Sequence, residues 1–300
     1  ADDGISMIRS ITAGTTLAIT LNSGWNLISR YVTPTHPDMK MVFGPIASSV
    51  DIVKNCDGDS YIPLLMINGI GNWNLLEGYQ VKANKMDTLQ VIGQQAVPEA
   101  NPMPLNTGWN CISYLRDSPM NVAMVFSAIQ GQISLVKNND GKIYSPQFGI
   151  NTIGNMLPGQ GYKVKALSNT TLLYKSNFTS PVDERGEHKI ETDMLHFVLD
   201  SKLNTGNNAT IILMPSVVDD VIHSGDEIGV FSPSGVLCGT AVYQGDNLAI
   251  TVWGDDPSTS GIVEGIQLGE AYHFKLWNSV QQAENTLRTS FLSGINSYEQ

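Results

Sequence analysis

Cysteine and long apolar runs are both scarce in this chain of 300 residues. The three cysteines do not make a disulfide framework, and we expect Cys56, Cys111 and Cys238 to be small buried residues, with a bridge or a reactive thiol as the alternative. No apolar run approaches the roughly 18 residues of a membrane-spanning helix. The hydrophobic fraction of 42% allows packed cores, and the length suits two or three domains. The sequence therefore predicts a globular protein that does not span a membrane.

Signatures of the common catalytic and cofactor sites are also missing. The sequence has no G-x-S-x-G elbow, no P-loop and no G-x-G-x-x-G fingerprint. Its five histidines are scattered, and no two have the spacing of a zinc-binding pair. Asn55, Asp57 and Asp59 approach a calcium loop, but Met66 stands where the bidentate glutamate belongs, which favours a plain hairpin turn. We therefore expect a non-enzymatic protein.

Basic residues are scarce towards the end of the chain. Residues 181–300 hold 17 of the 28 acidic groups but only 5 of the 17 lysines and arginines, whereas residues 1–180 are nearly balanced. Nucleic-acid binding depends on lysine and arginine contacts to phosphate, so this distribution argues against a nucleic-acid partner. It suits cation binding or simple solubility.

One passage of the sequence occurs twice. Leu21–Ser29 returns as Leu105–Ser113, an offset of 84 residues, and Gly78–Ala83 returns as Gly161–Ala166, an offset of 83. Internal duplication predicts tandem units of the same fold. We therefore expect repeat unit 1 over 21–97 and repeat unit 2 over 98–178, with Trp25 and Trp109 as equivalent packed residues.

Each repeat predicts a strand, a short helix, a hairpin and a closing strand. In the second copy, Ser118 suits an N-cap, and apolar residues at helical spacing predict a helix over 119–130. The corresponding helix in the first copy is predicted over 37–46. Asp140-Gly141 is a strong hairpin signal. Tyr162–Ala166 alternates as a half-buried strand does. Each unit is therefore predicted to be α+β.

The remaining segments predict an arm, a linker and an all-β domain. Residues 1–20 are expected to form an N-terminal strand or arm, and the charged residues 179–193 a linker. Residues 194–300 predict an acidic β-sandwich. The predicted fold is thus mainly β, with two tandem homologous α+β repeats followed by this sandwich. Its expected strands are His196–Asp200, Ala209–Met214, Glu227–Phe231, Val236–Tyr243, Leu248–Trp253, Tyr272–Asn278 and Thr289–Leu292.

Two groups of motifs cover most of the chain. One is the doubled Gly-Trp-Asn…Val-Lys-Asn…Gly-Tyr…Val-Lys repeat, and the other joins Gly225–Phe231 to Ala249–Asp256. In both, the chain resembles modular secreted and surface proteins of the Bacteroidetes. The resemblance implies export through type IX secretion and a place outside the cell. Because Ala1 is not an initiator methionine and no sorting domain follows Gln300, we expect a product trimmed at both ends.

Two candidate ligand sites follow from residue chemistry. Asp255 and Asp256 lie in a Gly/Ser/Thr-rich loop, and with Asp226 and Glu227 they offer the hard oxygen ligands that calcium prefers. Ordinary solvated carboxylates are the competing interpretation. Trp73, together with the two repeat tryptophans, suggests a sugar-stacking platform, although Met156 at its equivalent position favours core packing.

These observations favour a secreted structural or adhesive protein that assembles into a cell-surface or extracellular filament or layer. The arm, with Ile5, Met7, Ile8 and Ile11, is expected to pair with an exposed sheet edge of another copy. The alternative is a carbohydrate-binding module of a secreted surface protein. The expected partners are accordingly other copies of the chain, surface polysaccharide, or both. No cofactor other than calcium is expected.

Overall fold

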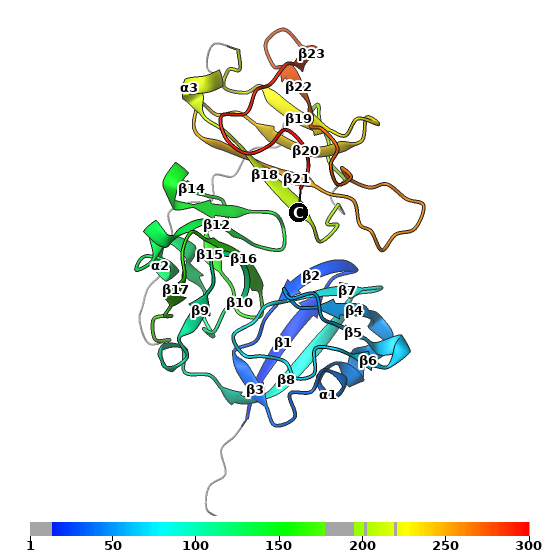
Figure 1. Ribbon diagram of the computed structural model, residues 1–300, viewed down its shortest axis with the longest axis vertical. Helices are drawn as coiled ribbons and strands as arrows, with labels where there is room; N and C mark the ends of the chain where they lie inside the picture. Colours follow the sequence, from blue (N-terminus) through cyan, green and yellow to red (C-terminus); the bar gives the residue numbers. More distant parts are fainter. Residues whose placement is uncertain (1–13, 178–194, 201–202, 219–220, 300) are drawn as a thin grey trace, which may run out of the picture.

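The computed structural model describes residues 14–177, 195–200, 203–218 and 221–299, and strands predominate among them (Figure 1). The paired strands within every sheet are antiparallel. No helix in the described part of the chain is long and apolar enough to cross a membrane.

Buried apolar side chains gather in three clusters along the chain. These clusters span Leu17–Val91, Met103–Tyr174 and Ile211–Tyr298. We call the segments around them the N-terminal unit (residues 14–97), the central unit (98–177) and the C-terminal unit (195–299). The prediction of a mainly β protein is confirmed.

The N-terminal unit contains a three-stranded and a five-stranded sheet. The order of the smaller sheet is β1 (Thr15–Leu21), β8 (Asp87–Gln95), β3 (Val32–Pro34). The order of the larger sheet is β2 (Gly24–Ile28), β7 (Tyr79–Ala83), β4 (Val50–Lys54), β5 (Ser60–Ile62), β6 (Ile67–Asn68).

The central unit contains a five-stranded sheet and two strand pairs. The order of the large sheet is β10 (Gly108–Ser113), β16 (Gly161–Ala166), β12 (Ile133–Lys137), β13 (Ile143–Ser145), β14 (Ile150–Asn151). The pairs are β9 (Met103–Leu105) with β17 (Thr170–Leu172), and β11 (Met120–Asn121) with β15 (Asn155–Met156). In the two large sheets Trp25 pairs with Lys82 and Trp109 with Lys165, so these pairs hold corresponding register positions.

The helices are shorter than predicted. The α-helices are α1 (Met39–Phe43), α2 (Val122–Val125) and α3 (Pro215–Val218), and the 3₁₀ turns are η1 (Gly44–Ser49), η2 (Pro63–Leu65), η3 (Pro98–Ala100), η4 (Gln130–Gln132) and η5 (Pro146–Phe148). Ser118 is not the N-cap of α2, because the side chain of Asn121 accepts the hydrogen bond from the amide of Ala123. The expected apolar stripe is nevertheless buried, as Val122 and Phe126 illustrate.

The last part of the N-terminal strand or arm expected over residues 1–20 is a strand, but it belongs to the sheet of its own unit and is not free to pair with another copy. Strand β1 pairs along its whole length with β8 of the same unit, and Ile19 lies opposite Leu89. Strand β9 pairs with β17 in the corresponding place of the central unit. The remainder of the arm, with Ile5, Met7, Ile8 and Ile11, lies outside the described residues.

The C-terminal unit has two antiparallel sheets that share one hydrophobic cluster, a sandwich-like arrangement. One sheet pairs β18 (Asn208–Leu213) with β21 (Leu248–Trp253), and the order of the other is β20 (Leu237–Val242), β19 (Glu227–Phe231), β22 (His273–Asn278), β23 (Ala283–Leu287).

Two strands predicted for the C-terminal unit are absent from the described residues. His196–Asp200 is irregular, because the carboxylate of Glu227 accepts from the amides of His196 and Phe197 in place of a neighbouring strand. Thr289–Leu292 is irregular too, and the outer strand beside β22 is the polar β23 instead.

Candidate functional site

The N-terminal and central units meet through reciprocal backbone hydrogen bonds. The amide of Ser29 donates to the carbonyl of Gly159 at 2.9 Å, and the amide of Ser113 donates to the carbonyl of Leu76 at 3.1 Å. Ser113 follows Ser29 by 84 residues and Gly159 follows Leu76 by 83, which are the offsets of the repeated sequence. Each unit therefore makes the same bond to the other. The contact between the two units is thus reciprocal. It also places the outer strands β2 and β10 against the opposite unit, which protects their edges.

A disulfide crosses the same interface. Cys56, in the turn between β4 and β5, is bonded to Cys111 on β10, with Cα atoms 5.7 Å apart. The expectation that all three cysteines are unpaired is therefore wrong for these two, because the interface lays the hairpin turn of one unit against the outer strand of the other. Cys238 is free and buried, and burial raises the pKa of its thiol to about 11.

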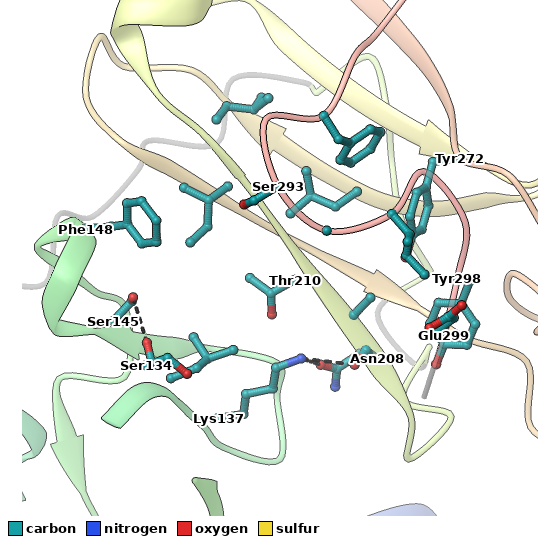
Figure 2. Close-up of a pocket in the computed structure, with 18 of the residues that line it drawn as sticks. Ser134, Lys137, Ser145, Phe148, Asn208, Thr210, Tyr272, Ser293, Tyr298 and Glu299 are labelled. Carbon is teal, nitrogen blue, oxygen red and sulfur yellow. Dashed lines mark hydrogen bonds between the residues drawn. The ribbon is translucent and has the colours of Figure 1, made fainter. Parts of the chain in front are cut away.

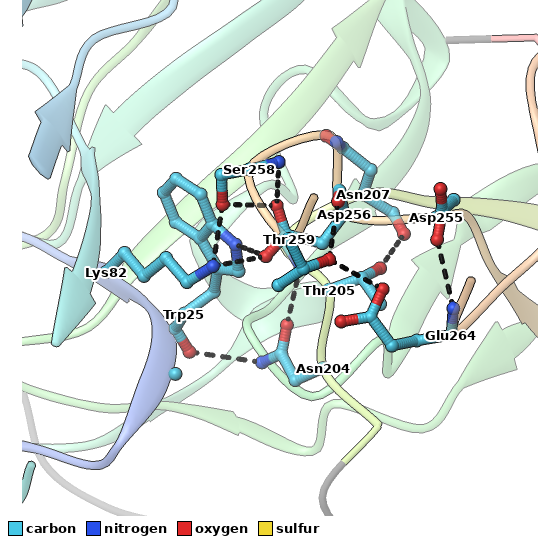
Figure 3. Close-up of polar contacts among 12 residues, drawn as sticks. Trp25, Lys82, Asn204, Thr205, Asn207, Asp255, Asp256, Ser258, Thr259 and Glu264 are labelled. Carbon is cyan, nitrogen blue, oxygen red and sulfur yellow. Dashed lines mark hydrogen bonds and ion pairs between the residues drawn. The ribbon is translucent and has the colours of Figure 1, made fainter. Parts of the chain in front are cut away.

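Asp256 attaches the C-terminal unit to the N-terminal unit. Its carboxylate accepts a hydrogen bond from the indole N–H of Trp25 at 2.8 Å and forms an ion pair with Lys82 at 2.7 Å (Figure 3). The amide of Ser258 donates to the other carboxylate oxygen at 2.9 Å. Burial opposes ionisation, but the hydrogen bonds from Lys82, Ser258 and Trp25 outweigh it and lower the pKa of Asp256 to about 2.

The ring of Trp25 is enclosed by its neighbours. It is only 7% exposed, and the amines of Lys54 and Lys82 lie 5.0 and 5.8 Å from the ring centre. Gly206 of the C-terminal unit lies against the ring so closely that a Cβ there would be 2.8 Å from it. The ring of Trp25 and the amines beside it are therefore already in contact with other parts of the protein.

The corresponding tryptophan of the central unit is open. Trp109 is 43% exposed, although the amines of Lys137 and Lys165 lie 5.5 and 5.8 Å from its ring centre. The prediction that Trp25 and Trp109 are both packed residues is therefore wrong for Trp109. The difference arises because the loop that carries Asp256 reaches only the first of the two tryptophans.

A cavity of about 940 Å³ lies between the central and C-terminal units, with Leu27, Cys56 and Gln80 of the N-terminal unit also in its lining, and Trp109 is among its lining residues. Lys137 reaches across it, and its amine donates to the backbone and side-chain oxygens of Asn208 at 3.0 and 2.9 Å (Figure 2). Figure 2 also places the Thr210 side chain in this space. The hydroxyl of Thr210 is buried and has no hydrogen-bond partner among the described residues.

Three lysines of the central unit line the cavity: Lys137, Lys163 and Lys165. Burial, followed by repulsion from the other two, lowers the pKa of Lys137 to about 7. Burial and Lys54 also lower the pKa of Lys163. The lining includes one carboxylate, that of Glu299, but within the described part of the chain no ion pair joins any of these lysines to an acid. An anion would offset this positive charge.

The acids considered for calcium already accept hydrogen bonds from the protein. Asp226 and Glu227 each accept from two backbone amides, and Asp255 accepts from the amide of Glu264. Asp256 serves the unit interface. Among the residues that the structure describes, no group of three or more histidine, cysteine or acidic side chains is arranged to hold a metal. Calcium binding stays a prediction.

Trp73 is a core residue. It is 1% exposed, stacks on Phe43 with ring centres 5.6 Å apart and meets Tyr79 edge-on at 5.7 Å. It is therefore not accessible as the sugar-stacking residue considered from the sequence. The exposed indole is that of Trp109, and its lysine neighbours were not identified as site residues from the sequence. The outward alternation of Lys163 and Lys165 on β16 was the available signal.

Similarity to known proteins gives no guide to this site. No family model, curated protein or solved structure matches the chain. Its function is therefore inferred from the geometry of the described residues.

Proposed function

We propose that the protein is a non-enzymatic extracellular structural or adhesive protein, a self-assembling subunit of a filament or layer at the cell surface. The observation that carries this proposal is the disulfide between Cys56 and Cys111, because disulfides persist outside the reducing cytosol. The resemblance of the repeat to secreted and surface proteins of the Bacteroidetes supports the same location and export by type IX secretion.

The joints between the units support a structural role. The N-terminal and central units share backbone hydrogen bonds and a disulfide, and the C-terminal unit is fixed to the first through Asp256. It also contacts the second, where the hydroxyl of Thr251 donates to the carbonyl of Gly141 at 2.7 Å. Units joined at every boundary resist being pulled apart, which suits a subunit of a filament or layer.

We interpret the first two units as tandem homologous repeats with an α+β plan. Their large sheets have corresponding strand orders, and the ladders carry a register shift at matching places, between Val50 and Ile52 and between Ile133 and Leu135. Bulges are conserved features of a fold, so a shared bulge favours common origin over coincidence. Duplication of this kind is typical of structural and binding proteins.

Electron microscopy and sedimentation of the full chain test the assembly role. We expect filaments or sheets from the full chain, and soluble monomers after deletion of residues 1–13, which removes Ile5, Met7, Ile8 and Ile11 but leaves β1 intact. Replacement of Asp2 and Asp3 by asparagine is the control and should leave assembly unchanged. A full chain that stays monomeric at high concentration, or a deletion variant that assembles normally, contradicts the proposal.

Carbohydrate binding is the second candidate function, and the exposed ring of Trp109 beside the cavity favours it. Indole faces stack on sugar rings, and the amide and hydroxyl groups in the lining supply hydrogen bonds. Affinity electrophoresis in gels that contain polysaccharides tests this function. Trp109→Ala should abolish retardation, whereas Leu64→Ala, at an exposed apolar side chain of the N-terminal unit, should not. Equal mobility of the wild type in all gels contradicts it.

A further inference from the structure

The N-terminal unit contains a filled counterpart of the Trp109 site. Trp25 and Lys82 pair across β2 and β7 as Trp109 and Lys165 pair across β10 and β16, and a second lysine lies over each ring. The occupant of the first site is the carboxylate of Asp256, which the indole N–H and the Lys82 amine both contact. The protein thus shows which chemical group this arrangement of side chains binds.

The second site has no such occupant within the described residues. Neither the indole N–H of Trp109 nor the amine of Lys165 is hydrogen-bonded to a described side chain, and no ion pair reaches Lys165 there. Lys163 also lines the cavity. The same donors as in the first site are therefore available to a ligand that enters the cavity.

We propose that Trp109 and Lys165 bind the carboxylate of a uronic-acid residue in an acidic polysaccharide, with the sugar ring against the exposed indole face and the adjacent sugars in the cavity. The indole N–H and the lysine amine donate to the carboxylate, as their counterparts do to Asp256. The hydrogen bonds are charge-assisted and therefore among the stronger ones in proteins.

The shape and the lining of the cavity favour a saccharide over a protein loop. The C-terminal unit forms the opposite wall through β18, so the occupant must fit between two fixed surfaces (Figure 2). A volume of about 940 Å³ is at the upper end of ordinary small-ligand pockets and holds a short oligosaccharide. The hydroxyl of Ser134, a partly exposed lining residue, donates to the carbonyl of Lys165 and can still accept a hydrogen bond from a sugar hydroxyl.

This inference rests on the carbohydrate-binding candidate and is independent of self-assembly. Titration calorimetry of the full chain at pH 7 with tetragalacturonate tests it. The matched control ligand is the methyl ester of the same tetrasaccharide, which keeps the sugar rings but lacks the negative charge. An acidic peptide that contains Asp-Pro-Ser, the sequence at Asp256, represents a protein source of the carboxylate.

We expect one tetragalacturonate to bind per chain and the methyl ester to bind at least about tenfold more weakly. Lys165→Gln and Trp109→Ala should each weaken tetragalacturonate binding by at least about tenfold. Lys142→Gln, at an exposed lysine of the same unit outside the cavity lining, should leave the affinity within about twofold of the wild type. Unchanged circular dichroism establishes that the variants are folded.

Three results would contradict the inference, and each has a different consequence for the other proposals. If the ester binds as tightly as the acid and Trp109→Ala abolishes both, carbohydrate binding survives but the carboxylate role of Lys165 is wrong. If the peptide binds more tightly than tetragalacturonate, the natural ligand is a protein rather than a saccharide. If neither sugar binds, or if Lys165→Gln binds like the wild type, the site is not a uronate site. The test of filament formation is separate and is not affected by this result.

Discussion

Ser29 and Ser113 hold equivalent positions in two units and contact each other's unit in the same way. The hydroxyl of Ser29 donates to the carbonyl of Gln160 at 2.5 Å, and the hydroxyl of Ser113 donates to the carbonyl of Glu77 at 2.8 Å. The same pair of backbone positions is therefore used twice across one interface, which is how a two-fold dimer is built. Here the arrangement lies within a single chain.

Glycine is required where these units touch. A Cβ on Gly78 would lie 2.7 Å from the carbonyl oxygen of Ile112, and one on Gly161 would lie 2.7 Å from that of Ile28. Both clashes are with backbone, which cannot move aside. Gly78→Ala and Gly161→Ala should therefore each lower the free energy of unfolding by about 1–3 kcal/mol, measured by urea denaturation. Gly131→Ala, where the new methyl group meets nothing within 4 Å, should change it by less than about 0.5 kcal/mol.

Short sequence patterns correctly predicted the turns and strands that depend mainly on neighbouring residues in the chain. The hairpin at Asp140-Gly141 and the alternation of Tyr162–Ala166 are confirmed, and Glu227–Phe231 and Leu248–Trp253 are strands with the predicted bounds. The role of Gly161 in the Gly-Tyr motif was not predictable, because its contact belongs to a unit more than a hundred residues away in sequence.

The disulfide should stabilise the interface measurably. In the chain-entropy model, a cross-link that closes a loop of 55 residues contributes about 4 kcal/mol. The double variant Cys56→Ser/Cys111→Ser should therefore unfold at a lower urea concentration than the wild type. Dithiothreitol should lower the wild-type midpoint to that of the variant and leave the variant unchanged. A wild type that reductant does not affect, despite a thiol count that confirms reduction, contradicts the prediction.

The disulfide was not predictable from the duplication alone. Cys56 and Cys111 occupy different positions of the repeat, where the other copy has Asn139 and Leu27. They meet because the hairpin turn of one unit lies against the outer strand of the other, a relationship that only the interface creates.

The two tryptophans should differ sharply in their contribution to stability. Trp25 is buried and its indole N–H is bonded to Asp256, so Trp25→Ala should cost about 3–5 kcal/mol. Trp109 is 43% exposed, and Trp109→Ala should cost less than about 1 kcal/mol. Chemical denaturation of both variants measures the difference. Equal losses would show that Trp109 is packed as Trp25 is.

Asp256 should make stability fall in acid. Its pKa is about 2 in the folded chain and 3.8 in the reference state, so the unfolded chain binds the proton more readily. Its contribution, about 2 kcal/mol, is present above pH 4 and is lost as the pH falls from about 4 to about 2. Asp256→Asn should weaken this part of the pH dependence and lower stability at pH 7. Asp140→Asn, at an exposed hairpin position, is the matched control. Identical slopes for wild type and Asp256→Asn between pH 4 and pH 2 contradict the assignment.

The lysine-lined cavity should make stability rise with pH above neutrality. Lys137 has a pKa of about 7 in the folded chain and 10.5 in the reference state, because of burial and the neighbouring Lys163 and Lys165. Between these values the unfolded chain binds more protons, so the free energy of unfolding increases with pH. From pH 7 to pH 8.5 the expected gain is roughly 1–2 kcal/mol.

The window must end near pH 8.5, because the pKa of Cys238 is raised to about 11 and this thiol acts in the opposite direction at higher pH. Lys137→Met should abolish most of the slope, since the remaining lysine with a lowered pKa is Lys163, whereas Lys142→Met should preserve it. Urea denaturation at pH 7.0 and 8.5 measures both slopes. A wild type whose stability is flat or falls across this window would mean that the amine of Lys137 is not held in a positively charged, desolvated environment.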